Sequence, residues 1–469
     1  MPRSLLPRQL LGDGTNGPRL AVYAFFLLLC ALGGGGSRSD IVSLLYLRPG
    51  AVLCLAAIML LPGPIELRPI RVPLLLLGAL AVWMLIQLVP LPPSLWTGLP
   101  GRELVANGAS VLGIEQPWRP ISMSPDLTLN SLVSLIVPLT ALVGFAALDP
   151  ESRRRLLPFL LILVLASALL AIGQISGGSE SRFYLYRITN NDAAVGFFAN
   201  RNHQAALLAI AFPMLALWAA REARDRRSRS IRYWVAGSFG IFLVPMILVT
   251  GSRAGLILGV IGILWACVAF ALERRMGNPL RGRGWRFPVL ILLPVLAVGV
   301  SFTYLALSRA QALLRFSSLE EAELRLEYLP LFTQMTRDLF PFGSGFGSFD
   351  PVFRIYEPIE TLSPRYLNQA HNDLMELAIT GGAPALLLLG AFVIWWLLAS
   401  VRVLRAWRQP SRTGAFARLG AVVILLLLLA SLVDYPLRVP FMSALFALAC
   451  GWLAQRPPPA AASDQGGAA

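Results

Sequence analysis

The sequence predicts an all-α, polytopic integral membrane protein, a bundle of about twelve transmembrane helices. Of its 469 residues, 56% are hydrophobic and only 14% are charged, whereas soluble globular proteins contain about 25% charged residues. The hydrophobic residues also fall in continuous runs of about 20, the length that a helix needs to cross the hydrocarbon core. One membrane bundle therefore accounts for a chain that would otherwise have to divide into two or more soluble domains.

Roughly twelve hydrophobic runs define the predicted transmembrane spans. They cover residues 19–36, 48–62, 71–90, 127–148, 156–176, 203–220, 232–249, 254–272, 287–307, 384–401, 414–433 and 437–454. An even number of spans places both termini on the same side of the membrane. The densest arginine clusters, at residues 221–232, 273–286 and 402–418, then lie on that side too. Because positively charged loops remain in the cytoplasm, we expect both termini to be cytoplasmic.

The net charge of +15 does not indicate nucleic-acid binding. Lysine is absent, so all 40 basic residues are arginines, and they lie in short clusters between apolar runs. Proteins that bind single-stranded nucleic acid instead combine basic and aromatic residues along a polar groove. The four cysteines, Cys30, Cys54, Cys267 and Cys450, share no metal-ligand spacing. The sequence therefore predicts no nucleic-acid partner, no metal and no cofactor.

The long loops all fall on the predicted periplasmic face, where residues 177–202 form one of them. The predicted organisation has three parts: transmembrane helices over residues 1–195 with a loop at 90–126, a core over 196–455 with a large loop at 308–383, and a disordered cytoplasmic tail over 456–469. An active site on the periplasmic face would be built from these loops.

The large loop is predicted to contain short helices. Apolar residues recur at helical spacing over residues 324–339, and Pro341 ends that helix because it lacks an amide hydrogen. The glycines at 343–347 then indicate a turn. A second short helix begins at Asn372 or the residue after it, since either can cap a helix, and the glycine pair at 381–382 breaks it before the tenth span.

Both histidines of the chain, His203 and His371, fall on the predicted periplasmic face. Two histidines do not make a zinc site, which needs three or four ligands at recognisable spacing. A histidine can instead take a proton from an attacking hydroxyl group. Arginines suit a diphosphate because a guanidinium makes bidentate contacts with phosphate oxygens, and Arg201, Arg253 and Arg325 lie on the same face. These residue types suggest glycosyl transfer from a lipid diphosphate.

Signatures of other enzyme classes are missing from the sequence. No Gly-x-Ser-x-Gly stands in the strand–turn–helix context of a hydrolase. The glycines at 343–347 follow a predicted helix rather than a strand, and they lack the lysine of a phosphate-binding loop. The energy for a reaction must therefore come from an activated substrate.

Three stretches resemble the O-antigen ligase and O-antigen polymerase family. Residues 196–203, Gly-Phe-Phe-Ala-Asn-Arg-Asn-His, resemble the Asn-x-Asn block that begins a helix in these proteins. Residues 252–255, Ser-Arg-Ala-Gly, resemble their Ser-Arg-small-Gly turn. Arg325, the Pro- and Gly-rich stretch 338–349 and the His-Asn pair within 371–377 follow one another as in the family's large periplasmic loop. The resemblance extends from about residue 196 to residue 384, and the order of the motifs makes it specific.

The resemblance implies an enzyme, a metal-independent inverting glycosyltransferase with a GT-C-like fold. Its donor would be a glycan linked to undecaprenyl diphosphate. Its acceptor would be the lipid A–core oligosaccharide in a ligase, or another lipid-linked repeat unit in a polymerase. By position, Arg253 and Arg325 would hold the diphosphate, and His371 would activate or orient the acceptor hydroxyl. Five further residues would bind substrate: Arg201, Asn202, His203, Asn372 and Glu376.

Ligase is favoured over polymerase because the Asn-Arg-Asn-His form of residues 200–203 looks ligase-like. Family members often carry a glutamate nine residues after the loop histidine, where this chain has Thr380. If that glutamate assists the chemistry, Glu376 would have to substitute for it. The product would be a lipopolysaccharide or another surface glycan such as an exopolysaccharide.

Two other classes of function remain as alternatives. A lipid or glycan transporter or flippase predicts charged residues near the bilayer midplane, and the predicted spans contain almost none. A non-enzymatic scaffold would leave the clustering of His203, His371 and Arg253 on one face unexplained. The candidate residues also have simpler roles, since His371 could cap a helix, Arg253 could anchor a helix end at the membrane surface, and Arg325 could pair with Glu321.

Overall fold

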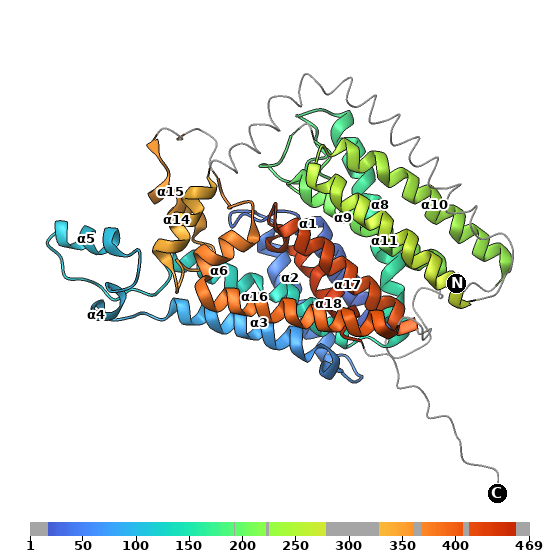
Figure 1. Cartoon of the computed structure of the whole chain (residues 1–469), viewed down its shortest axis with the longest axis horizontal. Coiled ribbons are helices and arrows are strands. Elements are labelled where there is room, and N and C mark those ends of the chain that lie inside the picture. Colours follow the sequence, from blue (N-terminus) through green and yellow to red (C-terminus); the bar gives the residue numbers. More distant parts are fainter. Residues whose placement is uncertain are drawn as a thin grey trace, which may run out of the picture.

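The computed structural model describes residues 17–191, 193–221, 225–277, 328–359, 362, 367–406 and 412–455. Within these ranges the regular structure is helical, apart from one antiparallel bridge between Leu91 and Arg119. Eight of the described helices are long and apolar enough to cross a membrane, and three more are apolar but shorter. Figure 1 shows them as one bundle, with a group of short helices at one end.

The eight long spans are α3 (Leu67–Leu88), the consecutive α6 (Pro125–Ser134) and α7 (Ile136–Ala146), α8 (Pro150–Ser176), α9 (Arg201–Ala220), α10 (Arg226–Val249), α11 (Arg253–Gly277), α16 (Asp373–Arg405) and α17 (Arg412–Ser431). The shorter apolar helices are α1 (Gly17–Gly33), α2 (Leu44–Leu60) and α18 (Pro440–Ala454). Each overlaps a predicted span, so the predicted polytopic helix bundle is confirmed. The ninth predicted span, residues 287–307, lies outside the described residues, as do the predicted tail and residues 324–327 of the predicted 324–339 helix.

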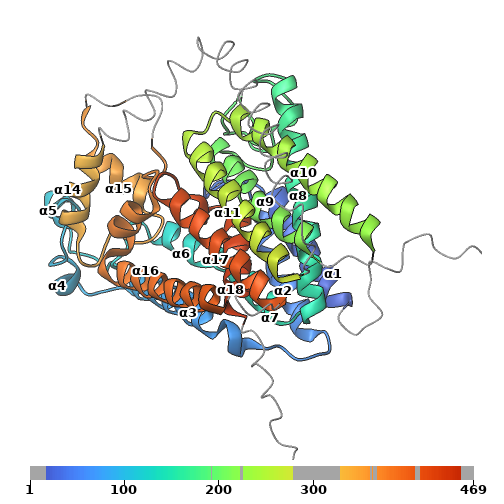
Figure 2. The same cartoon turned by 45° about the vertical axis from the view of Figure 1, so that its right-hand side comes forward.

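Helix α9 lies at the centre of the bundle. In its most apolar window 78% of the residues are buried, against 17% for α3 and for α16, which lie at the periphery. Helix α11 packs closely along α9, because a methyl group added at Gly262 would lie 2.6 Å from the Ala209 carbonyl oxygen. Gly255 likewise faces Ala205, so α9 and α11 run parallel and begin at the same end of the bundle (Figure 2).

Most loops described by the structure gather at this same end, which we call the loop end. The segment after α1 joins the starts of two other helices there, since the carbonyl oxygen of Gly35 accepts from the Ala199 amide at 3.0 Å and that of Gly34 accepts from the Phe441 amide at 2.9 Å. Four short helices extend from it: α4 (Pro93–Trp96), α5 (Glu103–Val111), α14 (Leu329–Leu339) and α15 (Phe349–Tyr356). The helix predicted before Pro341 is therefore present, whereas α4, α5 and α15 were not predicted.

Helices α14 and α15 have an apolar core of their own. Buried aromatic rings from both helices meet there, with Phe332 and Phe349 at a centroid distance of 5.6 Å and Tyr328 and Phe353 at 5.3 Å. Ile379 of α16 belongs to the same cluster. This small core holds the predicted large loop against the start of α16.

The glycine turn at 343–347 lies against α16 and α6. Gly343 and Gly345 adopt left-handed backbone angles, with φ of 74° and 99°. A methyl group at Gly343 would lie 2.5 Å from the Thr380 carbonyl oxygen, so no side chain fits between the turn and α16. Gln87 of α3 bridges the same region, because its amide nitrogen donates to the Thr380 carbonyl at 3.0 Å. The predicted helix break is also present, as a kink at Gly382 where φ is 64°.

The opposite end of the bundle is held by a buried arginine. The guanidinium of Arg19, which is 1% exposed, donates to the carbonyl oxygens of Leu61 and Gly63 at 2.7 Å each. It also donates to Pro64 at 2.9 Å and to Ala147 at 3.0 Å. One side chain of α1 therefore ties the α2–α3 turn to the end of α7.

Replacing Arg19 with methionine should destabilise the bundle. Methionine fills similar space but leaves buried carbonyl oxygens without donors, and hydrogen bonds to a charged group contribute about 1.5–3 kcal/mol each. We expect thermal unfolding in detergent at a clearly lower temperature than wild type. The control is Arg71→Met, because Arg71 is an exposed arginine of α3. Equal unfolding temperatures for the two variants would contradict this role of Arg19.

Candidate functional site

A buried carboxylate, Asp434, lies at the centre of the loop end. It follows α17, and its side chain is 3% exposed. One carboxylate oxygen, Oδ2, accepts from the side-chain amides of Asn200 at 3.0 Å and Asn202 at 2.6 Å. The other, Oδ1, accepts from the Tyr435 backbone amide at 3.0 Å and lies 3.3 Å from Nδ1 of His371. A buried charge needs such partners, and here they come from the starts of α9 and α16 as well as from its own turn.

His371 lies at the start of α16 in an unusual backbone conformation. Its φ is 49°, and it is the one residue other than glycine with a positive φ in the described chain. Such conformations cost energy and cluster at functional sites. Helix capping does not explain it, because Asn372 is the cap and its side-chain oxygen accepts from the amides of Leu374 and Met375. With Nδ1 directed at Asp434, Nε2 is the ring nitrogen left to carry a lone pair.

His203 lies on the other side of Asp434 and is more deeply buried. Its side chain is 2% exposed, and Nε2 lies 3.9 Å from Asp434 Oδ1. Neither ring nitrogen has a hydrogen-bond partner among the described residues. The Tyr435 ring stands edge-on to both imidazoles, at centroid distances of 5.2 Å to His203 and 4.9 Å to His371. One carboxylate and one aromatic ring therefore fix the positions of both histidines.

The surroundings of Asp434 keep it ionised. Burial raises the pKa of its carboxyl, but the neighbouring His203 and His371 and the hydrogen bonds from His371 and Asn202 outweigh burial, so the pKa lies well below its usual range. A lowered pKa of this kind stabilises the fold at neutral pH, and the contribution is lost only as the pH falls through the lowered value. These partners therefore favour the ionised form of Asp434 at neutral pH.

Arg438, four residues after Asp434, forms a second charge cluster, which is partly buried. Its Nε donates to Asp373 Oδ1 at 3.1 Å, and its Nη1 lies 2.9 Å from Glu376 Oε1. The Glu376 side chain is fully buried and also accepts from the Ala370 amide at 2.9 Å. Burial lowers the pKa of Arg438, but the two carboxylates raise it above its usual value, so the guanidinium stays charged. This cluster attaches the α17–α18 turn to the first turn of α16.

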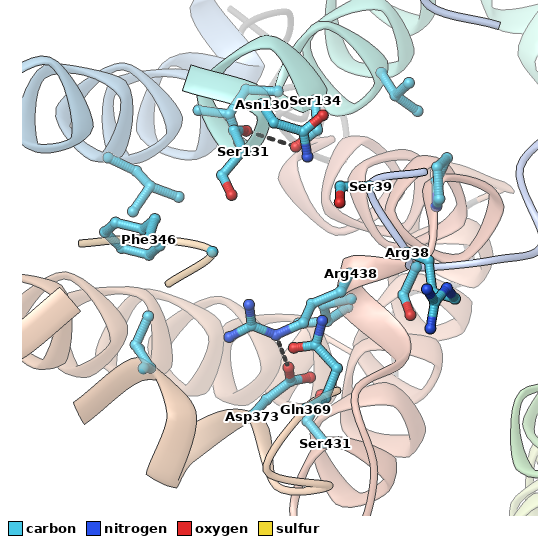
Figure 3. A pocket seen from close by; sticks show the side chains of 18 of the residues that line it. Arg38, Ser39, Asn130, Ser131, Ser134, Phe346, Gln369, Asp373, Ser431 and Arg438 are labelled. Atoms are coloured by element: carbon cyan, nitrogen blue, oxygen red, sulfur yellow. Dashed lines mark hydrogen bonds and ion pairs between the residues drawn. The ribbon is translucent and has the colours of Figure 1, made fainter. Parts of the chain in front are cut away.

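A cavity of about 690 Å³ opens beside this second cluster, between α2, α3, α6, α16, α17 and α18. Figure 3 shows Arg438 and Asp373 on one wall, facing Asn130 and Ser131 of α6 across the open space. Its other walls are apolar and include Trp396. The volume lies within the range of roughly 300–1,000 Å³ that is usual for ligand sites. The cavity is thus polar near the loop end and apolar along the transmembrane helices.

Residues 236–390 match a family model described as O-antigen ligase. The match supports the assignment of this part of the chain to the O-antigen ligase and polymerase family. No curated protein matches the chain. The family implies a glycan ligase or polymerase activity, with lipid-linked glycan and acceptor partners in a bacterial membrane. The match contains His371, whereas Asp434 and His203 lie outside it.

The structure brings most of the predicted site residues together. His203, Asn202 and His371 contact or face Asp434. Asn372 caps α16 and donates to the Leu432 carbonyl at 2.9 Å, so it helps to hold the α17 end in place. Glu376 is enclosed by its pair with Arg438 and presents no exposed surface.

The three predicted arginines, Arg201, Arg253 and Arg325, differ in position and in exposure. Arg201 is partly buried at the start of α9, where its backbone amide donates to the Asn190 side chain at 3.0 Å. Arg253 is exposed at the start of α11, at the loop end. Arg325 lies outside the described residues. Thr380 donates its hydroxyl to the Glu376 carbonyl at 2.7 Å, within α16.

The sequence analysis missed Asp434, Arg438 and Asn200. A signal for the first two was present, because Asp434 and Arg438 are the sole charged residues between Arg418 and Arg456 in the sequence. Charged residues in a short turn between strongly apolar runs need partners from elsewhere in the fold. The residues next to Asp434 in the sequence do not identify those partners, because Asn200 and Asp434 are 234 residues apart in the chain.

Removing Arg438 should destabilise the loop end, and neutralising its partners should restore it. Arg438→Met leaves the fully buried Glu376 carboxylate and the partly buried Asp373 carboxylate without a counter-charge, and losing one partner of a buried ion pair typically costs about 3–5 kcal/mol. The triple variant Arg438→Met, Asp373→Asn, Glu376→Gln should recover much of the thermal stability in detergent. Failure of the triple variant to unfold later than the single variant would argue that Arg438 acts through packing instead of charge.

Proposed function

We propose that the protein is an O-antigen ligase-like glycosyltransferase. It moves a glycan from undecaprenyl diphosphate to lipid A–core, or to another surface acceptor, at the periplasmic face of the inner membrane. The observation that carries this proposal is the geometry of His371 and Asp434, in which a buried anion lies 3.3 Å from one imidazole nitrogen. A carboxylate in that position orients a histidine and stabilises its protonated form.

The bonds change in one displacement step. Nε2 of His371 takes the proton of the acceptor hydroxyl, and the hydroxyl oxygen attacks the anomeric carbon of the donor sugar. The bond from that carbon to the diphosphate oxygen breaks, and undecaprenyl diphosphate leaves with the electron pair. Attack opposite the leaving group inverts the anomeric configuration. The reaction in this scheme is metal-independent, because arginines take the negative charge of the leaving group.

Arg253 and Arg325 are the proposed diphosphate ligands. Support for Arg253 comes from its exposed position at the start of α11, beside the start of α9 that carries His203. Asn202 acts through Asp434, and we propose that Arg201 contacts the donor from the same helix start. The proposed orientation rests on charge, since described arginines such as Arg227, Arg229 and Arg402 lie at the end opposite to the histidines.

The test of this function is a strain that lacks the gene, complemented with wild type or with His371→Ala. Lipopolysaccharide on gels and glycan on undecaprenyl diphosphate are both measured. We expect a core without O-chain, polymer accumulating on the lipid carrier, and restoration by wild type alone. A core with a single repeat unit would indicate a polymerase. An unchanged ladder in the deletion strain would contradict both lipopolysaccharide roles.

Asp434→Asn should slow transfer without removing the protein from the membrane. Asparagine keeps the shape of the side chain but loses the negative charge that orients and stabilises His371, and general base catalysis contributes about 10²–10⁴-fold. We expect a loss of about 100-fold in the transfer rate of purified protein. Glu103→Gln, which neutralises an exposed carboxylate of α5, is the control. Equal rates for the Asp434 and Glu103 variants would show that the carboxylate does not act on the chemistry.

A further inference from the structure

Three arginines line the cavity, Arg38, Arg48 and Arg438, and Arg48 differs from the other two. Arg38 has a carboxylate partner, Asp40, at 2.9 Å, and Arg438 has two. Arg48 of α2 has none among the described residues. Its single hydrogen bond there is to the Asn130 carbonyl oxygen at 3.3 Å, and its buried Nε has no partner.

Arg48 also borders a second hollow, an apolar groove of about 720 Å³ between α2, α3, α6 and α7. Every other residue that lines the groove is apolar or glycine, and they include Leu74, Leu77 and Ile136. Val52 and Val133 on its border are 49% and 44% exposed, so hydrocarbon can reach the groove from the side of the bundle. Arg48 therefore stands where a polar cavity meets an apolar groove.

The positive charge of Arg48 in this position suits the phosphate group of a lipid. An arginine within the span of a membrane is costly without a counter-ion, and a phosphate satisfies a guanidinium with two parallel hydrogen bonds. A phosphate whose attached chain enters the groove belongs to a lipid. Asn130, Ser131 and Gln369 on the cavity walls supply amides and hydroxyls of the kind that bind sugar hydroxyls.

We infer that Arg48 binds a phosphate of the glycolipid acceptor, with an acyl chain of that lipid in the groove and its sugars in the cavity. The assignment to the acceptor rests on the proposed function, in which Arg253 serves the donor. No described residue of α9 or α11 lines the cavity, so the Arg48 site is built by other helices than the Arg253 site. The two lipids then bind at separate places in the bundle.

The first experiment measures lipid binding to purified full-length protein in detergent by native mass spectrometry. The probes are lipid A–core, undecaprenyl diphosphate and phosphatidylglycerol. Arg48→Gln should weaken binding of lipid A–core about 10- to 100-fold and leave undecaprenyl diphosphate within about twofold of wild type. Arg71→Gln, which removes an exposed arginine of α3, should change neither. Undecaprenyl diphosphate losing affinity in place of lipid A–core would overturn the assignment, as would phosphatidylglycerol competing equally with lipid A–core.

A second variant tests the groove without touching Arg48. A side chain at Gly78 of α3 would meet no protein atom within 4 Å, so Gly78→Leu fills the groove and should fold. We expect weaker binding of lipid A–core, whereas Gly240→Leu of α10, which has equal space and lines neither hollow, should bind as wild type. If Gly78→Leu bound lipid A–core as tightly as wild type, the placement of the acyl chain in the groove would be overturned.

The binding results stand apart from the proposed activity. If wild type binds lipid A–core through Arg48 but transfers no glycan to it, the proposed function fails and the binding site remains. If wild type transfers glycan and Arg48→Gln has the acceptor affinity of wild type, the inference about Arg48 fails and the proposed function remains.

Discussion

The burial of Asp434 is the constraint on which the loop end depends. A carboxylate that is 3% exposed is tolerated only where donors surround it. Asn200 and Asn202 supply two from the start of α9, and His371 faces it from the start of α16. These contacts can be made only when α9, α16 and the α17–α18 turn meet at the same point. A site assembled from three distant segments therefore forms together with the fold, because the buried carboxylate lacks donors until those segments meet.

The same turn also carries a positive charge, at Arg438, that is paired with carboxylates. The partly buried Arg438 pairs with both Asp373 and Glu376 of α16, so one positive charge there faces two negative ones. Because the two clusters lie on one short segment, the position of α16 is fixed at two points. His371, which stands between α16 and the turn, thereby gains a defined orientation even though its own φ of 49° is unfavourable.

The elements that depend on local chemistry were predictable from the sequence. Hydrophobic run length located the spans, and the glycines at 343–347 marked the turn because left-handed backbone angles favour glycine. The placement of His203 and His371 at one end followed from counting spans. Asp434 was not singled out, because its role depends on side chains such as Asn200 that are remote in sequence. The cavity was not predictable from the sequence either. An arginine such as Arg48 within an apolar run is typical of a side chain that extends to the membrane surface, and it does not by itself indicate a ligand site.

The division of the chain suggests how such a protein could change its acceptor while keeping its chemistry. The O-antigen ligase match covers α11, α14, α15 and the first half of α16, which carry Arg253 and His371. The groove is built instead from α2, α3, α6 and α7, which lie before the match, and these helices also form part of the cavity wall. A substitution on those helices alters the space beside α16 without moving Asp434 or its donors. If the reacting centre and the lipid-binding walls are built from different segments, residues of the walls can be substituted to fit a different lipid. Residues of the reacting centre cannot, because its buried charges must stay paired.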